Sequence, residues 1–146
     1  MQPIDLKIGG DAEYILFQIL DAERPEATDY WDANWLVVDV SLQAGAFRGK
    51  YRAAIERYAF LSFREQVQHL YAALDAQAKF ETMEGQVLLT LVGDRFGHIA
   101  LHGVAMDRPG DGNRLTFESR RLDQSWLPGI IKQLDNIVAQ YPVKGI

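Results

Sequence analysis

Asn34-Trp-Leu-Val-Val-Asp-Val-Ser-Leu-Gln-Ala-Gly-Ala-Phe-Arg-Gly-Lys-Tyr-Arg-Ala-Ala-Ile-Glu56 has the pattern of a β-hairpin. Apolar and polar side chains alternate along both arms, residues 34–43 and 46–56, as they do in strands with one buried face. A glycine lies between the arms, where a tight turn needs it. The segment therefore predicts two antiparallel strands that share one apolar face.

The register of this hairpin follows from its side-chain alternation. A two-residue turn at Ala44-Gly45 pairs Leu42 with Phe47 on the apolar face and Asp39 with Lys50 on the polar one. A three-residue turn would set apolar residues opposite polar residues throughout, because the side-chain period of a strand is two. The even register also predicts that Trp35 lies exposed on the outer face.

Similar patterns extend through the rest of the chain and define the fold class. Strand-like segments are predicted at Ile4–Ile8, Tyr14–Leu20, Gln86–Gly93, His98–Met106 and Arg114–Arg121. Apolar residues recur at helical spacing over about 59–76 and 124–141, which predicts two amphipathic helices. We expect an α+β fold, with an antiparallel sheet of about 5–8 strands and both helices covering one face.

Composition limits the classes of function. The 146 residues suit a single domain spanning 1–146, and the absence of cysteine excludes thiol catalysis and disulfides. Met1-Gln-Pro-Ile-Asp5 lacks a basic segment followed by an apolar run, and no stretch is long enough to span a membrane. The expected location is the cytoplasm.

The net charge of −5 is concentrated near the N-terminus. Residues 1–32 hold eight acids against two bases, whereas residues 33–146 hold twelve acids against thirteen bases. An acidic patch disfavours nucleic acid and attracts basic partners. The sequence thus leaves two alternatives, a solvated loop or a docking surface for a basic protein.

No motif for catalysis, a cofactor or a metal site is present, so a non-enzymatic protein is expected. His98 and His102 lie on one face of a predicted strand, but roughly 13 Å apart, which is too far for one metal ion. An alternative from another class is a small-molecule or metal-binding domain that uses the outer sheet face around His98, His102 and Thr90.

The segment Asp29–Leu36 combines two tryptophans and a tyrosine with two acids. Aromatic side chains beside acids are typical of a protein-binding hot spot that faces a basic partner. Trp31 could instead fold back onto the edge of the core. The residues expected to contact a partner are Glu26, Asp29, Trp31, Asp32 and Trp35.

A second interaction surface is predicted within residues 86–106. Leu88, Val92, Val104 and Met106 alternate onto the outer face of the two strands there and make it unusually apolar. Such a patch could form a homodimer interface, which is the third alternative, a structural or oligomerisation module.

Several segments together resemble the small bacterial immunity proteins of the WapI type, or a related uncharacterised bacterial family of the same pattern. They are Asp29–Leu36, Gly45–Gly49, Phe63–Gln66, Leu70–Leu74, Glu84–Val87 with Leu89–Leu91, and Leu122–Leu127. The resemblance implies a cytoplasmic protein that binds and neutralises the C-terminal domain of a cognate toxin, in the WapI case a tRNA-cleaving one. It carries over no binding residues, and it does not extend to the first 28 residues.

Overall fold

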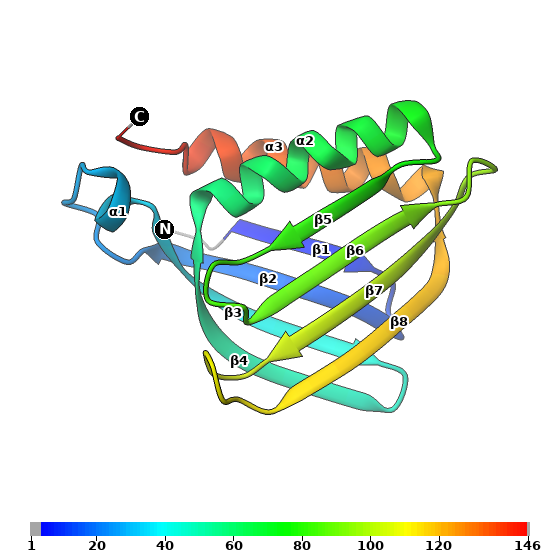
Figure 1. Cartoon of the computed structure of the whole chain (residues 1–146), viewed down its shortest axis with the longest axis horizontal. Coiled ribbons are helices and arrows are strands. Elements are labelled where there is room, and N and C mark those ends of the chain that lie inside the picture. The colour runs from blue at the N-terminus through cyan, green and yellow to red at the C-terminus, as the bar shows by residue number, and fades with distance from the viewer. Residues whose placement is uncertain (1–3, 146) are drawn as a thin grey trace.

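The computed structural model describes residues 4–145 and contains two four-stranded antiparallel sheets (Figure 1). The first sheet has the order β1-β2-β3-β4 and the second has the order β5-β6-β7-β8. The elements are β1 (Ile4–Gly9), β2 (Glu13–Ala22), α1 (Tyr30–Ala33), β3 (Trp35–Ala44), β4 (Phe47–Glu56), α2 (Arg57–Ala73), β5 (Gln77–Glu81), β6 (Val87–Gly93), β7 (His98–Met106), β8 (Arg114–Asp123), the 3-10 turn η1 (Gln124–Trp126) and α3 (Leu127–Gln140).

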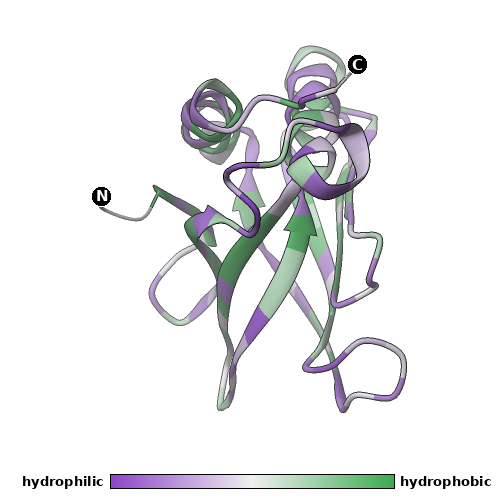
Figure 2. Cartoon of the chain, turned by 90° about the vertical axis from the view of Figure 1, so that its left-hand side faces the viewer, coloured by the Kyte–Doolittle hydropathy of each residue, from purple (hydrophilic) through white to green (hydrophobic). Residues whose placement is uncertain are grey.

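The two long helices cover one open side of the pair of sheets. Helix α2 packs on edge strand β5, α3 packs on edge strand β1, and the two helices contact each other. Seen from the end that carries α1, they lie side by side above the sheets (Figure 2). Each helix also bonds to the backbone of the edge it covers. The amide of Lys7 donates to Gln133 Oε1 at 2.8 Å, and the amide of Lys79 donates to Gln66 Oε1 at 2.9 Å.

Four phenylalanines join both sheets to α2 at the centre of the core. Phe80 of β5 lies 5.1 Å from Phe17 of β2, 5.2 Å from Phe60 and 5.4 Å from Phe63, measured between ring centroids. All four side chains are fully buried. The tilted and edge-on contacts between them are those that aromatic rings prefer. Phe80 therefore contacts the first sheet and α2 from the second sheet, within a core to which both sheets contribute.

The predicted single sheet is wrong, although the α+β class is confirmed. The strands divide into two sheets because α2 separates β4 from β5 and carries the chain onto a second layer. The predicted helices 59–76 and 124–141 correspond to α2 and to η1 with α3, and they cover the side between two edge strands instead of one sheet face. The prediction did not include the short elements β5 and α1.

The hairpin has the predicted parity but a different register. Its turn is at Gly45-Ala46, so Asp39 pairs with Arg52 instead of Lys50. Gly45 has φ of 62°, and a two-residue turn that needs a positive φ at its first position favours glycine there. Arg52 Nε lies 2.9 Å from Asp39 Oδ1, and this hydrogen bond lowers the pKa of Asp39.

Residues 1–3, which belong to the segment that lacks the features of a signal peptide, lie outside the described residues, as does Ile146. Within residues 4–145, no helix has the length and apolar character required to cross a membrane.

Replacing Phe80 with alanine should lower the free energy of unfolding by about 3–5 kcal/mol, because the change opens a cavity where both sheets and α2 meet. Urea unfolding followed by circular dichroism measures this loss. The control is Phe47→Ala, since Phe47 is 67% exposed and its loss should change stability by no more than about 0.5 kcal/mol. Equal effects of the two variants would contradict the assigned core.

Candidate functional site

A cleft of about 420 Å³ lies at the end of the molecule that carries α1. It is bounded by α1 and the start of β3 on one side, by the first turns of α2 on another, and by the end of β5 with residues 82–83 on the third. Its aromatic walls are formed by Tyr30, Trp31, Trp35 and Tyr58. The cleft thus adjoins the segment that the sequence singled out.

Helix α1 is held by hydrogen bonds from the two residues that flank it, Asp29 and Asn34. Asp29 is its N-cap, and the Asp29 carboxylate accepts from the amide of Asp32 at 3.1 Å. Buried Asn34 follows the helix and donates from Nδ2 to the carbonyl of Tyr30 at 2.6 Å. Asn34 also exchanges two hydrogen bonds with the backbone of Lys144, at 3.0 and 2.9 Å. These contacts give a four-residue helix a fixed position.

Arg57, the first residue of α2, also holds the end of α1. Its Nε donates to the carbonyl of Ala33 at 3.1 Å, and its Nη1 donates to the carbonyl of Pro142 at 3.2 Å. The guanidinium also lies 5.5 Å from the ring of Tyr141. Arg57 therefore connects the start of α2, the end of α1 and the C-terminal segment.

The structure separates the predicted contact residues into exposed and structural ones. Trp31 is 70% exposed and meets Tyr30 edge-to-face with ring centroids 5.3 Å apart, so it does not fold back onto the core. Asp32 and Glu26 are exposed, whereas the exposed Asp29 is engaged as a cap.

Trp35 departs from its predicted exposure. It is half-buried and forms a wall of the cleft, because β4 leads directly into α2 beside it. Its partner across the sheet is Glu56, the last residue of β4.

Glu56 is the residue of the site that sequence reasoning missed. Its side chain lines the cleft, is only 9% exposed, and accepts from the amide of Met83 through Oε2 at 2.8 Å. The other oxygen, Oε1, is buried and has no hydrogen-bond partner among the described residues. Burial raises the pKa of Glu56, and the nearby charge of Glu84 adds to that rise. Strand alternation gave no signal for Glu56, because the residue lies at the junction where β4 ends.

The acids of the N-terminal region occupy both ends of the first sheet. Asp11 lies in the turn between β1 and β2, and Glu13 pairs with Arg121 of β8 at 3.2 Å, so neither belongs to the α1 end. The acids from the end of β2 through α1 are Asp21, Glu23, Glu26, Asp29 and Asp32. The negative surface beside the cleft is therefore smaller than the sequence total indicates.

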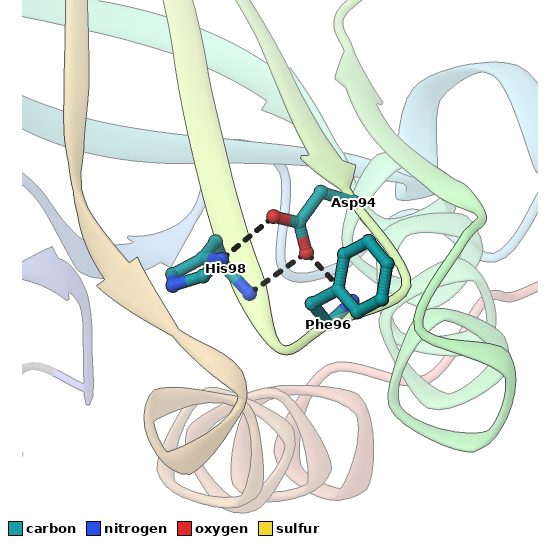
Figure 3. A network of polar contacts seen from close by, with 3 residues as sticks. All are labelled: Asp94, Phe96 and His98. Carbon is teal, nitrogen blue, oxygen red and sulfur yellow. Dashed lines mark hydrogen bonds and ion pairs between the residues drawn. The ribbon is translucent and has the colours of Figure 1, made fainter.

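The predicted histidine site is not assembled. His98 turns toward Asp94 in the β6–β7 connection, with Nδ1 2.7 Å from Asp94 Oδ2 (Figure 3). The amides of Phe96 and His98 donate to Asp94 Oδ1. Desolvation acts to raise the pKa of Asp94, but these hydrogen bonds outweigh it and lower that pKa. The arrangement fixes a turn.

His102 lies apart from His98, opposite Thr90 on the outer face of β6 and β7. His102 and Thr90 line a shallow depression of about 400 Å³ together with Glu118, whose carboxylate lies 3.5 Å from His102 Nδ1. Across residues 4–145, no group of three or more histidine and acidic side chains is placed to hold a metal ion.

The apolar stripe predicted for a homodimer is shorter than expected. Met106 is buried, because the connection before β6 covers it and Gly85 approaches its side chain. Leu88 remains 39% exposed, while Val92 and Val104 are half-buried.

Comparison with protein families matches residues 5–142 to the immunity protein WapI-like family. The matched range includes every strand and helix except the first residue of β1. Comparison with curated proteins gives no match.

Glu56→Gln should make the stability of the protein less sensitive to pH. The raised pKa of Glu56 means that the fold favours the neutral carboxyl. The wild type therefore loses stability as the pH rises from 4.5, the ordinary pKa of a glutamate, through the raised pKa of Glu56. The variant should therefore gain stability relative to wild type over that range and keep the gain at neutral pH. Urea unfolding from about pH 4 to pH 8 measures the difference.

Asp75→Asn removes the same charge from an exposed residue after α2 and controls for net charge. A stability difference between Glu56→Gln and wild type that stays constant with pH would contradict the assignment.

Proposed function

Because the chain belongs to the WapI-like immunity protein family, we propose that it binds the C-terminal domain of a cognate toxin and blocks it by contact instead of catalysis. The observation that carries the proposal is the exposed Trp31 on a helix whose position is fixed at both ends. A large apolar side chain held in water by a rigid support is typical of an interface anchor. The predicted contacts Glu26, Asp29, Asp32 and Trp35 lie at the same end of the molecule.

The acids around α1 support a basic partner. Asp32 follows Trp31 directly, and Glu26 precedes the helix in an exposed turn. Opposite charges across an interface speed the encounter and fix the orientation of the partners, and they do so most strongly at low ionic strength. A toxin domain that acts on RNA would present the basic surface that such acids attract.

The support of α1 also bears on affinity. A loop that must become ordered on binding loses conformational entropy, and this loss weakens the complex. Here the Asn34 bonds to Tyr30 and Lys144 hold the segment before any partner arrives. The proposal therefore predicts association without a large rearrangement of α1.

Trp31→Ala and Asp32→Ala should each weaken binding to the toxin domain encoded beside this gene by about 1–2 kcal/mol or more, because both remove interface contacts without touching the core. Isothermal titration calorimetry measures the change in Kd, and a toxin activity assay should show a matching loss of inhibition.

The control for Trp31→Ala is Phe96→Ala, which removes an 80% exposed aromatic side chain from the β6–β7 connection. Phe96→Ala should bind like the wild type. Unchanged affinity in a folded Trp31→Ala, Asp32→Ala double variant would exclude the α1 surface. Failure of the wild-type protein to bind a folded toxin domain would exclude the proposed function.

A further inference from the structure

Glu56, which lines the cleft beside α1, has one carboxylate oxygen without a hydrogen bond. Oε1 is buried and has no hydrogen-bond partner within residues 4–145, while Oε2 is held by the amide of Met83. A buried carboxylate oxygen without a donor is costly, and proteins seldom retain one without a role. Glu56 thus lies in the lining of the same cleft as Trp31.

The surroundings of this carboxylate favour a cation. Glu81 lines the same cleft and Glu84 lies close enough to raise the pKa of Glu56, whereas Lys79 is the positive residue of the lining. The lining therefore holds two acidic residues, Glu56 and Glu81, against one lysine, and Glu84 lies nearby outside the lining. The remaining walls are aromatic, and the faces of tyrosine and tryptophan attract cations.

We propose that this cleft receives an arginine side chain of the protein partner, whose guanidinium stacks on the aromatic walls and donates to the Glu56 carboxylate. The proposal rests on the proposed function and names the chemistry by which the partner is recognised. The walls that take part are Tyr30, Trp31, Trp35 and Tyr58. Trp31 then contributes to both the exposed α1 surface and the cleft.

Arginine fits this site better than the alternatives. A planar guanidinium can stack on an aromatic ring and bond a carboxylate at the same time, whereas a lysine ammonium is more strongly hydrated and does not stack. An apolar side chain would fill the cleft but would leave the buried oxygen without a donor. The cleft of about 420 Å³ has room for one such long side chain.

The first experiment uses a blocked amino acid and does not need the toxin. N-acetyl-arginine amide is titrated into the ¹⁵N-labelled protein up to about 100 mM, which detects a millimolar Kd. The indole N–H signals of Trp31 and Trp35 should shift in a saturable way. Trp126, which lies in η1 against the β1–β2 turn, serves as the internal reference and should not shift.

N-acetyl-citrulline amide is the matched ligand, because its side chain has nearly the same shape without the charge. It should cause much smaller shifts than the arginine compound. Equal shifts with both ligands, or no shifts with either, would overturn the proposal.

Variants distinguish the contribution of the Glu56 carboxylate to binding from that of the aromatic walls. Glu56→Gln should weaken binding of the arginine compound about tenfold or more, since the neutral amide no longer attracts the cation. Asp75→Asn, which removes one charge near the other end of α2, should leave binding unchanged. Tyr58→Ala alters an exposed wall without touching the core, and it should also weaken binding.

The toxin domain supplies the final test. Glu56→Gln should weaken toxin binding about tenfold or more while remaining at least as stable as the wild type at neutral pH, so the loss is not due to unfolding. Toxin affinity that falls in Trp31→Ala but is unchanged in Glu56→Gln would overturn the arginine proposal and leave the proposed function in place. Absence of toxin binding by the wild type would instead contradict the proposed function itself.

Discussion

Coverage of the two sheet edges β1 and β5 is the constraint on which the rest of the structure depends. An edge strand exposes unpaired backbone groups that can pair with another chain, and proteins protect such edges with covering elements. Here α3 covers β1 and α2 covers β5, and each supplies one glutamine side chain to the backbone it covers. The helices thereby bond to part of each edge and cover the core at the same time. They also bring the first turns of α2 beside the end of β5, which creates the cleft.

The second consequence of this arrangement is the support of α1. Because α2 begins directly after β4, Arg57 lies below α1 and reaches both Ala33 and Pro142. The C-terminal segment that follows α3 returns to the same place, where Lys144 meets Asn34. A single turn of helix is marginal by itself, so these contacts supply the stability that its length cannot. The position of α1 therefore depends on segments more than a hundred positions apart in the chain.

The parts of the fold that sequence predicted well are those in which side-chain pattern reports burial directly. The alternation of Leu36, Val38 and Val40 located a strand and its buried face, and the helical spacing around Leu134 located α3. The division into two sheets could not be predicted from the sequence, because it depends on which hairpins pack face to face. The turn of the β3–β4 hairpin was predicted one position too early, although Gly45 favoured the observed turn.

For the site, the aromatic and acidic composition of residues 29–36 indicated the end of the molecule where the cleft lies. It did not reveal that the side chains of Asp29 and Asn34 hydrogen-bond to the backbone of α1, since helix capping and partner binding use the same residue types. Glu56 could not be found, because its importance comes from burial among three elements. In α1, Asp29, Ala33 and Asn34 form the hydrogen bonds that hold the helix, whereas the side chains of Trp31 and Asp32 face water. Under the proposed function, evolution can vary the side chains of these two exposed residues to follow a changing partner, while selection for folding preserves the residues that hold the helix.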